Sequence, residues 1–140
     1  MNATRVAAYA LVRDEQRILL VRIAPGYPAS GQWTLPGGGV NFAEDPVATV
    51  VRELAEETGL VGTVEGLAFV HSGSGARDDG GAWHAIRIVY DVAIVGGELR
   101  DELDESTDRA AWFTLGEAHG LPLVDLARAA LDHDSRSRED

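Results

Sequence analysis

The chain has 140 residues, of which 45% are hydrophobic and 25% charged, and its formal net charge at pH 7 is −11. This length suits one domain, and no apolar run approaches the ~20 residues that cross a bilayer, so we expect no membrane partner. The acidic surface repels polyanions, which argues against a nucleic acid partner, and the absence of cysteine excludes disulfides, thiolate nucleophiles and cysteine-ligated zinc.

The N-terminal segment predicts a β-hairpin. Apolar side chains alternate from Val6 to Val12, a second apolar run occupies residues 18–23, and Asp14-Glu15-Gln16 forms a turn between them. A basic start and a small-residue cleavage site, the marks of a secretory signal, are both missing. We therefore expect a first strand here and take the cytoplasm as the default location.

A flexible stretch separates this hairpin from the first helix. Residues 24–32 are rich in proline and glycine and predict a loop, and residues 33–35 predict a short strand. Pro36 ends that strand, and the triplet Gly37-Gly38-Gly39 follows it. We expect an unusually free backbone at the triplet, because glycine has no side chain to restrict it.

The sequence predicts a helix between Asp45 and Gly59. Asp45 can cap the first turn, proline is tolerated at the first helical position, and Gly59 is a typical C-terminal stop. Helical spacing predicts one mostly apolar face turned toward a core, made of Val47, Val51, Leu54 and Thr58. The same spacing turns four charged residues away from that core, namely Arg52, Glu53, Glu56 and Glu57.

The second half of the chain predicts further strands followed by helices. The expected elements are strands at 64–72, 83–95 and 110–114, a helical turn at 115–118 and a helix at 121–131. The second of these strands is nearly all apolar, which predicts a central place in a sheet. The segment SGSGARDDGG predicts a flexible loop before it, and an acidic stretch at 98–108 follows it.

This order of elements predicts a mixed-sheet α/β (α+β) domain over residues 1–131. Residues 132–140 contain no apolar side chain to bury and are expected to form a disordered tail. We find no internal repeat and no linker that would divide the chain.

Three carboxylates stand together on the predicted helix. Glu53, Glu56 and Glu57 lie at positions i, i+3 and i+4, so neighbouring side chains are about 5–6 Å apart at Cβ. Two like charges 4 Å apart cost about 1 kcal/mol in bulk water and about 4 kcal/mol at an effective dielectric of 20. Oxygen ligands in this number suit Mg²⁺ or Mn²⁺. The alternative from spacing alone is a solvated acidic face in which Arg52 pairs with Glu56.

The segment 38–60 resembles the Nudix box. The matching positions, in order and without a gap, are Gly38, Glu44, Arg52, Glu53, Leu54, Glu56, Glu57, Gly59 and Leu60. The approach at 33–40 and the Ala111-Trp112-Phe113 strand are also similar to that family. Two positions depart from it, because many relatives carry Glu and Gly where Asn41 and Ala43 stand.

The resemblance implies a Nudix-like α/β/α sandwich with a mixed β-sheet between helices. It also implies that Glu53, Glu56 and Glu57 hold Mg²⁺, or Mn²⁺ in its place, with help from the backbone carbonyl of Gly38. A glycine there would let the backbone approach a cation or phosphate closely. Arg52 is then expected to pair with Glu44 and to orient the ligating carboxylates.

The implied activity is that of a pyrophosphohydrolase, which splits the phosphoanhydride bond of a nucleoside diphosphate linked to another moiety. A nucleoside triphosphate and an ADP-ribose-like compound are both open as the small-molecule substrate. The attacking water is deprotonated either by a helix glutamate or by one from a later loop, for which Glu102 and Glu105 are the candidates, with Glu98 behind them. The alternative for these three is a solvated loop carboxylate.

Several other residues have both a functional and a structural interpretation. Trp83 and His84 could stack on a nucleobase, although we favour core packing for Trp83 and an ordinary strand position for His84. Three arginines could meet substrate phosphates, although we favour a solubilising role for all of them: Arg5, Arg22 and Arg77.

Two functions from other classes remain open at this point. One is a non-catalytic Nudix-like nucleotide-sensing module, against which the complete set of Arg52 and the three helix glutamates argues. The other is a structural domain with an acidic face. Many relatives are homodimers, so the resemblance also implies a possible homodimer.

Overall fold

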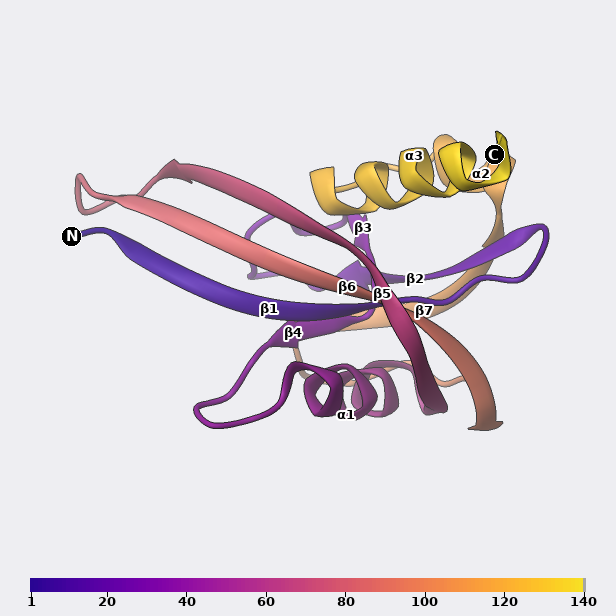
Figure 1. The fold of residues 1–140 in the computed structure, drawn as a ribbon. Coiled ribbons are helices and arrows are strands. Elements are labelled where there is room, and N and C mark those ends of the chain that lie inside the picture. Colours follow the sequence, from indigo (N-terminus) through magenta and orange to yellow (C-terminus); the bar gives the residue numbers. More distant parts are fainter. Residues whose placement is uncertain (140) are drawn as a thin grey trace.

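The computed structural model describes the backbone of residues 1–139 and the side chains of residues 1–133. Strands form the middle layer, with α1 on one side and α3 on the other (Figure 1), which confirms the predicted mixed α+β class. The elements are β1 Ala3–Leu11, β2 Arg17–Ile23, β3 Trp33–Thr34, β4 Gly37–Gly39, α1 Pro46–Thr58, β5 Leu60–Ala76, β6 Ala82–Gly97, β7 Thr107–Thr114, α2 Leu115–His119 and α3 Asp125–Glu139.

The strands belong to two sheets. The larger has the order β4-β1-β6-β5; β1 and β6 run parallel, and the other neighbours run antiparallel. The smaller has the antiparallel order β3-β2-β7. The strand β6 therefore lies between β1 and β5, as its apolar sequence predicts, while β4 forms an edge of the larger sheet.

The predicted N-terminal hairpin is wrong beyond its turn. The amide of Leu19 donates to the carbonyl of Val12 at 3.0 Å, but β1 then pairs with β4 and β6, whereas β2 pairs with β3 and β7. Alternating apolar residues indicate that a strand exists without selecting its partner. Here the partners come from distant parts of the chain, so the two strands enter different sheets.

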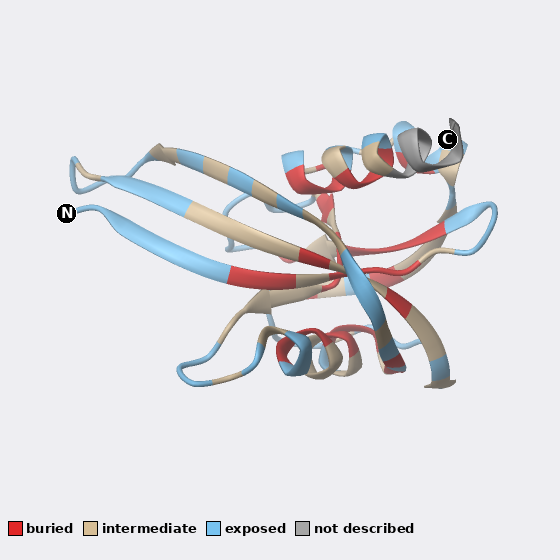
Figure 2. Cartoon of the chain, in the orientation of Figure 1, coloured by how far each residue is buried: buried red, intermediate tan, exposed pale blue. Residues whose placement is uncertain are grey.

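The core lies on both sides of the strand layer. One cluster packs under α3 and includes Leu20, Leu35 and Leu126, and the other packs over α1 and includes Leu19, Val50 and Leu54. Figure 2 shows buried residues between the two helices, whereas β1, β5 and β6 extend beyond them with exposed ends. Within residues 1–139, no helix is both long and apolar enough to cross a membrane.

The bounds predicted for α1 are confirmed, but its buried face differs from the prediction. Asp45 caps it through a 2.9 Å hydrogen bond from the amide of Val47, and Gly59 ends it in the left-handed conformation with φ of 77°. The helix buries Thr49, Val50, Leu54, Glu57 and Thr58. Val47 is 39% exposed, so the apolar face is rotated from the predicted one, and Glu57 turns toward the sheet.

Three further segments differ from the sequence predictions. The glycine triplet is not a free loop, because it forms β4 and pairs with β1. The predicted flexible loop shortens to residues 77–81, since β5 and β6 pair as far as Ala76 and Ala82. The last helix starts later than predicted and runs to Glu139, through most of the expected disordered tail, because residues 123–139 contain neither glycine nor proline to stop it. Asp140 lies outside the described residues.

Candidate active site

A cleft with a volume of about 820 Å³ opens beside β4. Its lining comes from β1, β4, α1, the ends of β2 and β3, the outer parts of β5 and β6, the 24–32 loop, the start of β7 and the start of α3. The cleft brings the carboxylates of Glu53 and Glu57 together with Arg5, Arg87 and Trp83. It therefore has an acidic part at α1 and a cationic part on the larger sheet.

Glu57 is the most buried carboxylate of the acidic part, with 3% of its surface exposed. The amide of Gly37 donates to its Oε1 at 2.6 Å, which fixes the carboxylate against β4. Burial raises the pKa of Glu57 well above its usual value, and the charges of Glu53 and Glu102 raise it further against that hydrogen bond. A cation bound nearby would lower the pKa of Glu57 and stabilise its ionised form.

Glu53 lies against the backbone of Gly38. A Cβ atom placed on Gly38 would lie 2.9 Å from the carboxyl carbon of Glu53, so only glycine leaves room for this approach. Burial raises the pKa of Glu53, although Arg52 opposes the shift. The structure thus brings together Glu53, Glu57 and Gly38, three of the residues that the resemblance implies for the metal.

Arg52 forms hydrogen bonds to the carboxylates of Glu44 and Glu53. Its Nε and Nη2 donate to the two carboxylate oxygens of Glu44 at 2.9 and 3.0 Å, and its Nη1 donates to Glu53 at 2.9 Å. Glu44 also accepts from the Thr49 hydroxyl at 2.7 Å. The hydrogen bonds from Arg52 and then Thr49 lower the pKa of Glu44 to about 2. Arg52 therefore joins the loop before α1 to the carboxylates on it.

The loop before α1 contains both departures from the family pattern, Asn41 and Ala43. Ala43 has a φ of 63°, in the left-handed region where glycine is favoured and alanine is strained. The hydrogen bond from the Asn41 amide to Glu44, at 3.2 Å, still closes the loop in this chain.

Glu56 is the most exposed of the three helix glutamates. Half of its side chain is exposed, and one oxygen accepts a 3.4 Å hydrogen bond from Nη1 of Arg52. Among the residues that the structure describes, no three acidic or histidine side chains are already gathered tightly enough to enclose a metal ion. Carboxylates from Glu53, Glu56 and Glu57 could do so once Arg52 releases Glu56, and these hard oxygen ligands suit Mg²⁺ or Mn²⁺.

Of the three predicted loop glutamates, Glu102 lies nearest to this cluster. Its Oε1 accepts a hydrogen bond from the Thr107 hydroxyl at 3.2 Å. Its pKa is raised by burial and then by the neighbouring charges of Glu105, Glu53 and Glu56. Glu105 is exposed and acts on Glu102 through its charge. Glu98 is exposed just after β6, where its backbone carbonyl lies against Gly59.

The cationic part contains residues whose roles the sequence analysis misjudged or missed. Arg5 and Trp83 line the cleft, and Trp83 is 38% exposed, so the favoured core position for Trp83 is wrong. Arg87 also lines the cleft and was missed, because its strand also contains the charged Asp91 and the sequence does not single out either residue. Arg22 pairs instead with Asp108 at 2.9 Å, outside the cleft.

Two remaining candidates lie on exposed parts of β6 and the loop before it. His84 is exposed, and its Nε2 lies 2.8 Å from the Ser72 hydroxyl. Arg77 forms an ion pair with Asp79 at 3.1 Å in the 77–81 loop. Neither lines the cleft among the described residues.

A comparison with family models identifies this arrangement of a sandwich and an acidic helix. The model described as NUDIX domain matches residues 3–134. The chain therefore belongs to the NUDIX domain family, and it is a Nudix hydrolase.

Known relatives agree with this assignment. The chain is 36% identical to ADP-ribose pyrophosphatase of Methanocaldococcus jannaschii, over 92% of this chain and 68% of that protein. It is also 36% identical to putative 8-oxo-dGTP diphosphatase 2 of Mycobacterium tuberculosis, over 88% of this chain and 82% of that protein. The solved MutT NUDIX hydrolase of Burkholderia pseudomallei is 29% identical, with a TM-score of 0.78 over 93% of this chain and 97% of that one.

Proposed function

We propose that this hydrolase uses a divalent metal ion to cleave a phosphoanhydride bond in a nucleoside diphosphate linked to another moiety. The observation that carries the proposal is the buried Glu57 carboxylate, which accepts a 2.6 Å hydrogen bond from Gly37 and lines the cleft together with Glu53. The names of two relatives, an ADP-ribose pyrophosphatase and a putative 8-oxo-dGTP diphosphatase, support a phosphoanhydride substrate.

The residues that would hold the metal are Glu53, Glu56, Glu57 and the carbonyl of Gly38. The donor set fits the ion, because Mg²⁺ and Mn²⁺ prefer carboxylate and carbonyl oxygens. The raised pKa values of Glu53 and Glu57 support the fit, since a cation would offset the burial and crowding that raise them. Arg52 and Glu44 would hold the helix and its preceding loop in position.

When bound, the ion would neutralise charge on the phosphate oxygens and acidify a bound water. The residues of the chain position the substrate and accept the proton of the attacking water. The oxygen of water forms a bond to phosphorus while the bridging bond between phosphorus and oxygen breaks, and the second phosphate leaves with the bridging oxygen. We assign the proton of the attacking water to the carboxylate of Glu102, because burial raises its pKa above the usual value and so makes the carboxylate a stronger base. Glu105 contributes through its charge on Glu102.

A substrate panel tests this proposal. Purified protein with Mg²⁺ is incubated with ADP-ribose, nucleoside triphosphates and an oxidised guanine triphosphate, and the products are separated. We expect turnover of at least one compound, and cleavage in ¹⁸O-labelled water identifies the phosphorus that is attacked. Saturable binding of a nucleotide without turnover of any compound would instead support the nucleotide-sensing alternative.

A further inference from the structure

Among the described residues, two arginines of the cleft, Arg5 and Arg87, form no ion pair with a carboxylate. Arg17, Arg22, Arg52, Arg77 and Arg128 each form an ion pair with a carboxylate. Among the described residues, no carboxylate forms an ion pair with Arg5 or Arg87, although acidic side chains outnumber basic ones by 23 to 12. Such a surplus of unpaired cations in a concave site predicts an anionic ligand.

The two arginines flank a single side chain, Tyr9. Both lower the pKa of the Tyr9 phenol against the larger raising effect of burial, so both guanidinium groups lie near that ring. Arg87 also lies 3.1 Å from Nδ1 of His71, which fixes one side of its guanidinium. Burial and then the charge of Arg87 lower the pKa of His71. His71 therefore tends to stay neutral and leaves the positive charge of this part of the cleft to the arginines.

Glycines form the surface on which these side chains lie. A Cβ atom on Gly39 would lie 2.9 Å from Nη2 of Arg5, and one on Gly73 would lie 2.6 Å from Nη1 of Arg87. A Cβ atom on Gly75 would lie 2.7 Å from Nε1 of Trp83. The side chains of Arg87 and Trp83 thus lie flat against β5, at positions two residues apart, which is roughly 7 Å along a strand.

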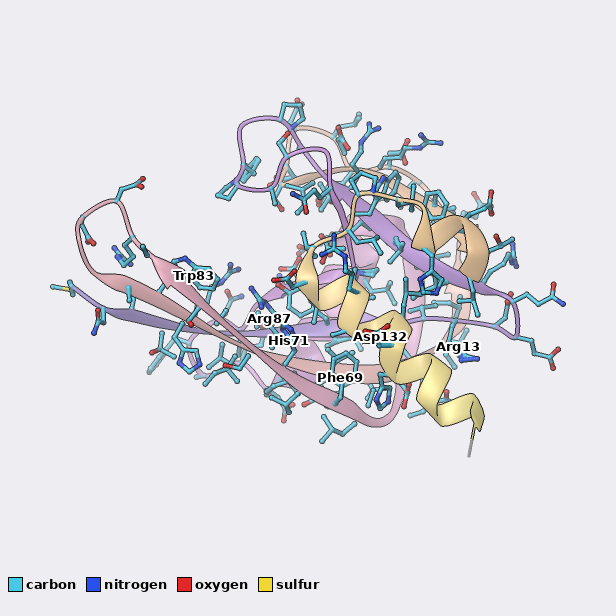
Figure 3. The ribbon with its side chains drawn as sticks, turned by 90° about the horizontal axis from the view of Figure 1, so that it is seen from above. Arg13, Phe69, His71, Trp83, Arg87 and Asp132 are labelled. Carbon is cyan, nitrogen blue, oxygen red and sulfur yellow. The ribbon has the colours of Figure 1, made fainter. Side chains whose placement is uncertain are left out.

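The order of groups along the cleft matches the order of groups in a nucleotide. Neighbouring residues of β4 point to opposite faces, so Glu53 approaches Gly38 from one face and Arg5 approaches Gly39 from the other. Because β4 is an edge strand of the larger sheet, a ligand bound beside this edge can contact Glu53 on one face and Arg5 on the other. Figure 3 shows His71, Arg87 and Trp83 following one another toward the protruding end of β5 and β6. Along the cleft, the carboxylates come first, the arginines follow, and the exposed indole of Trp83 lies last.

We propose that Arg5 and Arg87 bind the phosphate on the nucleoside side of the substrate, and that Trp83 stacks on its base. This inference rests on the proposed function, because the acidic part must receive the bond that is cleaved. Two guanidinium groups can give a phosphate several charge-assisted hydrogen bonds, and an indole offers a planar apolar face to a ring. These three residues therefore select a nucleoside diphosphate over inorganic pyrophosphate or a sugar phosphate.

Calorimetric titration of ADP in the presence of EDTA tests the arginines without turnover. We expect wild-type protein to bind ADP, and Arg5→Gln and Arg87→Gln each to weaken binding at least tenfold. Arg17→Gln is the matched control, because it removes the same charge at the β1–β2 turn, at the opposite end of β1 (Figure 1). No binding by wild-type protein, or equal affinity in Arg87→Gln and Arg17→Gln, would overturn the proposal.

A glycine variant tests the same site with both arginines intact. Gly73→Ala places a methyl group 2.6 Å from Nη1 of Arg87, which is too close, so the guanidinium must move, and we expect ADP binding to weaken several-fold. Gly66→Ala is the control on the same strand, since no atom lies within 4 Å of its added Cβ. If the two variants bind ADP equally well, the position of Arg87 does not matter and the assignment is wrong.

Separate ligands test the stacking residue. Trp83→Ala is expected to weaken ADP binding at least several-fold and to leave inorganic pyrophosphate binding unchanged, whereas a merely structural loss would weaken both. Equal loss for both ligands rejects Trp83 as the base platform. These titrations contain no metal and no turnover, so a protein that binds ADP through these residues but hydrolyses nothing with Mg²⁺ would contradict the proposed function alone.

Discussion

Glu44 and Glu57 belong to one acidic cluster but experience opposite environments. Glu44 accepts two hydrogen bonds from Arg52, which hold its pKa at about 2. Glu57 is buried against β4 beside other carboxylates, and its pKa is raised well above the usual value. One carboxylate therefore stabilises the folded chain in its ionised form, whereas the other resists ionisation until a cation compensates it.

Glu57→Gln is expected to lower kcat/KM by at least about a hundredfold with Mg²⁺. Glutamine keeps the oxygen that accepts from Gly37 but loses the charge, and a metal ion contributes several kcal/mol of transition-state stabilisation, with each 1.36 kcal/mol worth about tenfold. The measurement is initial-rate kinetics on the best substrate of the panel. Glu65→Gln, on the exposed part of β5, is the charge-matched control. Wild-type kinetics in Glu57→Gln would remove Glu57 from the metal site.

The same substitution is expected to change how stability depends on pH. The pKa of Glu57 in the folded state lies above its ordinary value of 4.5. Between these two pKa values the folded state binds more protons than the unfolded state, so the free energy of unfolding falls as pH rises from 4.5. In EDTA, Glu57→Gln should therefore raise the free energy of unfolding above that pH. Urea unfolding at several pH values measures this effect.

Glu44→Gln is expected to change the free energy of unfolding in the opposite direction in the same experiment. The folded pKa of Glu44 is about 2 against an ordinary 4.5, so its contribution is present above 4.5 and is lost as pH falls toward 2. We expect this variant to be less stable than the parent near neutral pH, with a difference that shrinks on acidification. Parallel curves for all three proteins would contradict both assignments.

The helix α1 ends where a glycine is required for two separate reasons. Gly59 has a φ of 77°, and a Cβ atom there would clash with the carbonyl oxygen of Glu98. Its amide also donates to Ala55 at 2.9 Å, which satisfies a carbonyl in the last turn. The chain can therefore leave the glutamate helix and enter β5 without displacing the acidic stretch that follows β6.

Gly59→Ala is expected to destabilise the fold by at least about 1–2 kcal/mol, the cost of a left-handed alanine, with the clash adding to it. Urea unfolding gives the difference in free energy. Gly116→Ala is the matched control, because it lies in α2 with no atom within 4 Å of its added Cβ and is expected to be neutral or slightly stabilising. Equal stability of both variants would show that the end of α1 tolerates a side chain.

Local signals predict α1 well, and long-range pairing explains what they miss. Asp45, Pro46 and Gly59 act on their own neighbours, so the sequence predicts both ends of the helix. The inward rotation of Glu57 depends on Gly37, 20 residues away, whose amide compensates a carboxylate that the helical pattern places in solvent. The separation of β1 from β2 depends on β6 and β7, which arrive much later in the chain.

At the scale of the whole molecule, the acidic part of the cleft could be predicted and the cationic part could not. The helix glutamates are neighbours in sequence, so their spacing already indicates a cluster. Arg5 and Arg87 meet at Tyr9 only because β1 and β6 pair in parallel, with Ala7 opposite Arg87. Single arginines in separate strands show no pattern before that pairing is known.

The net charge of −11 gives the whole molecule two different responses to cations. Any salt screens repulsion among exposed carboxylates, and this effect rises gradually with ionic strength. A site at Glu53, Glu56 and Glu57 instead saturates, and it stabilises the folded state by about 2.7 kcal/mol when the free ion exceeds its dissociation constant a hundredfold.

Thermal unfolding with Mn²⁺ or Mg²⁺ therefore separates binding from screening. We expect Tm to rise by several degrees and then level off, because a change of 1 kcal/mol moves Tm by roughly 2–8 °C for domains near this size. Potassium chloride at matched ionic strength should give only the gradual rise. With Mn²⁺ or Mg²⁺, the Tm of Glu57→Gln should rise only gradually, as it does with potassium chloride. The Tm of Glu65→Gln should still show the saturable rise. A step that persists in Glu57→Gln would place the ion elsewhere on this acidic surface.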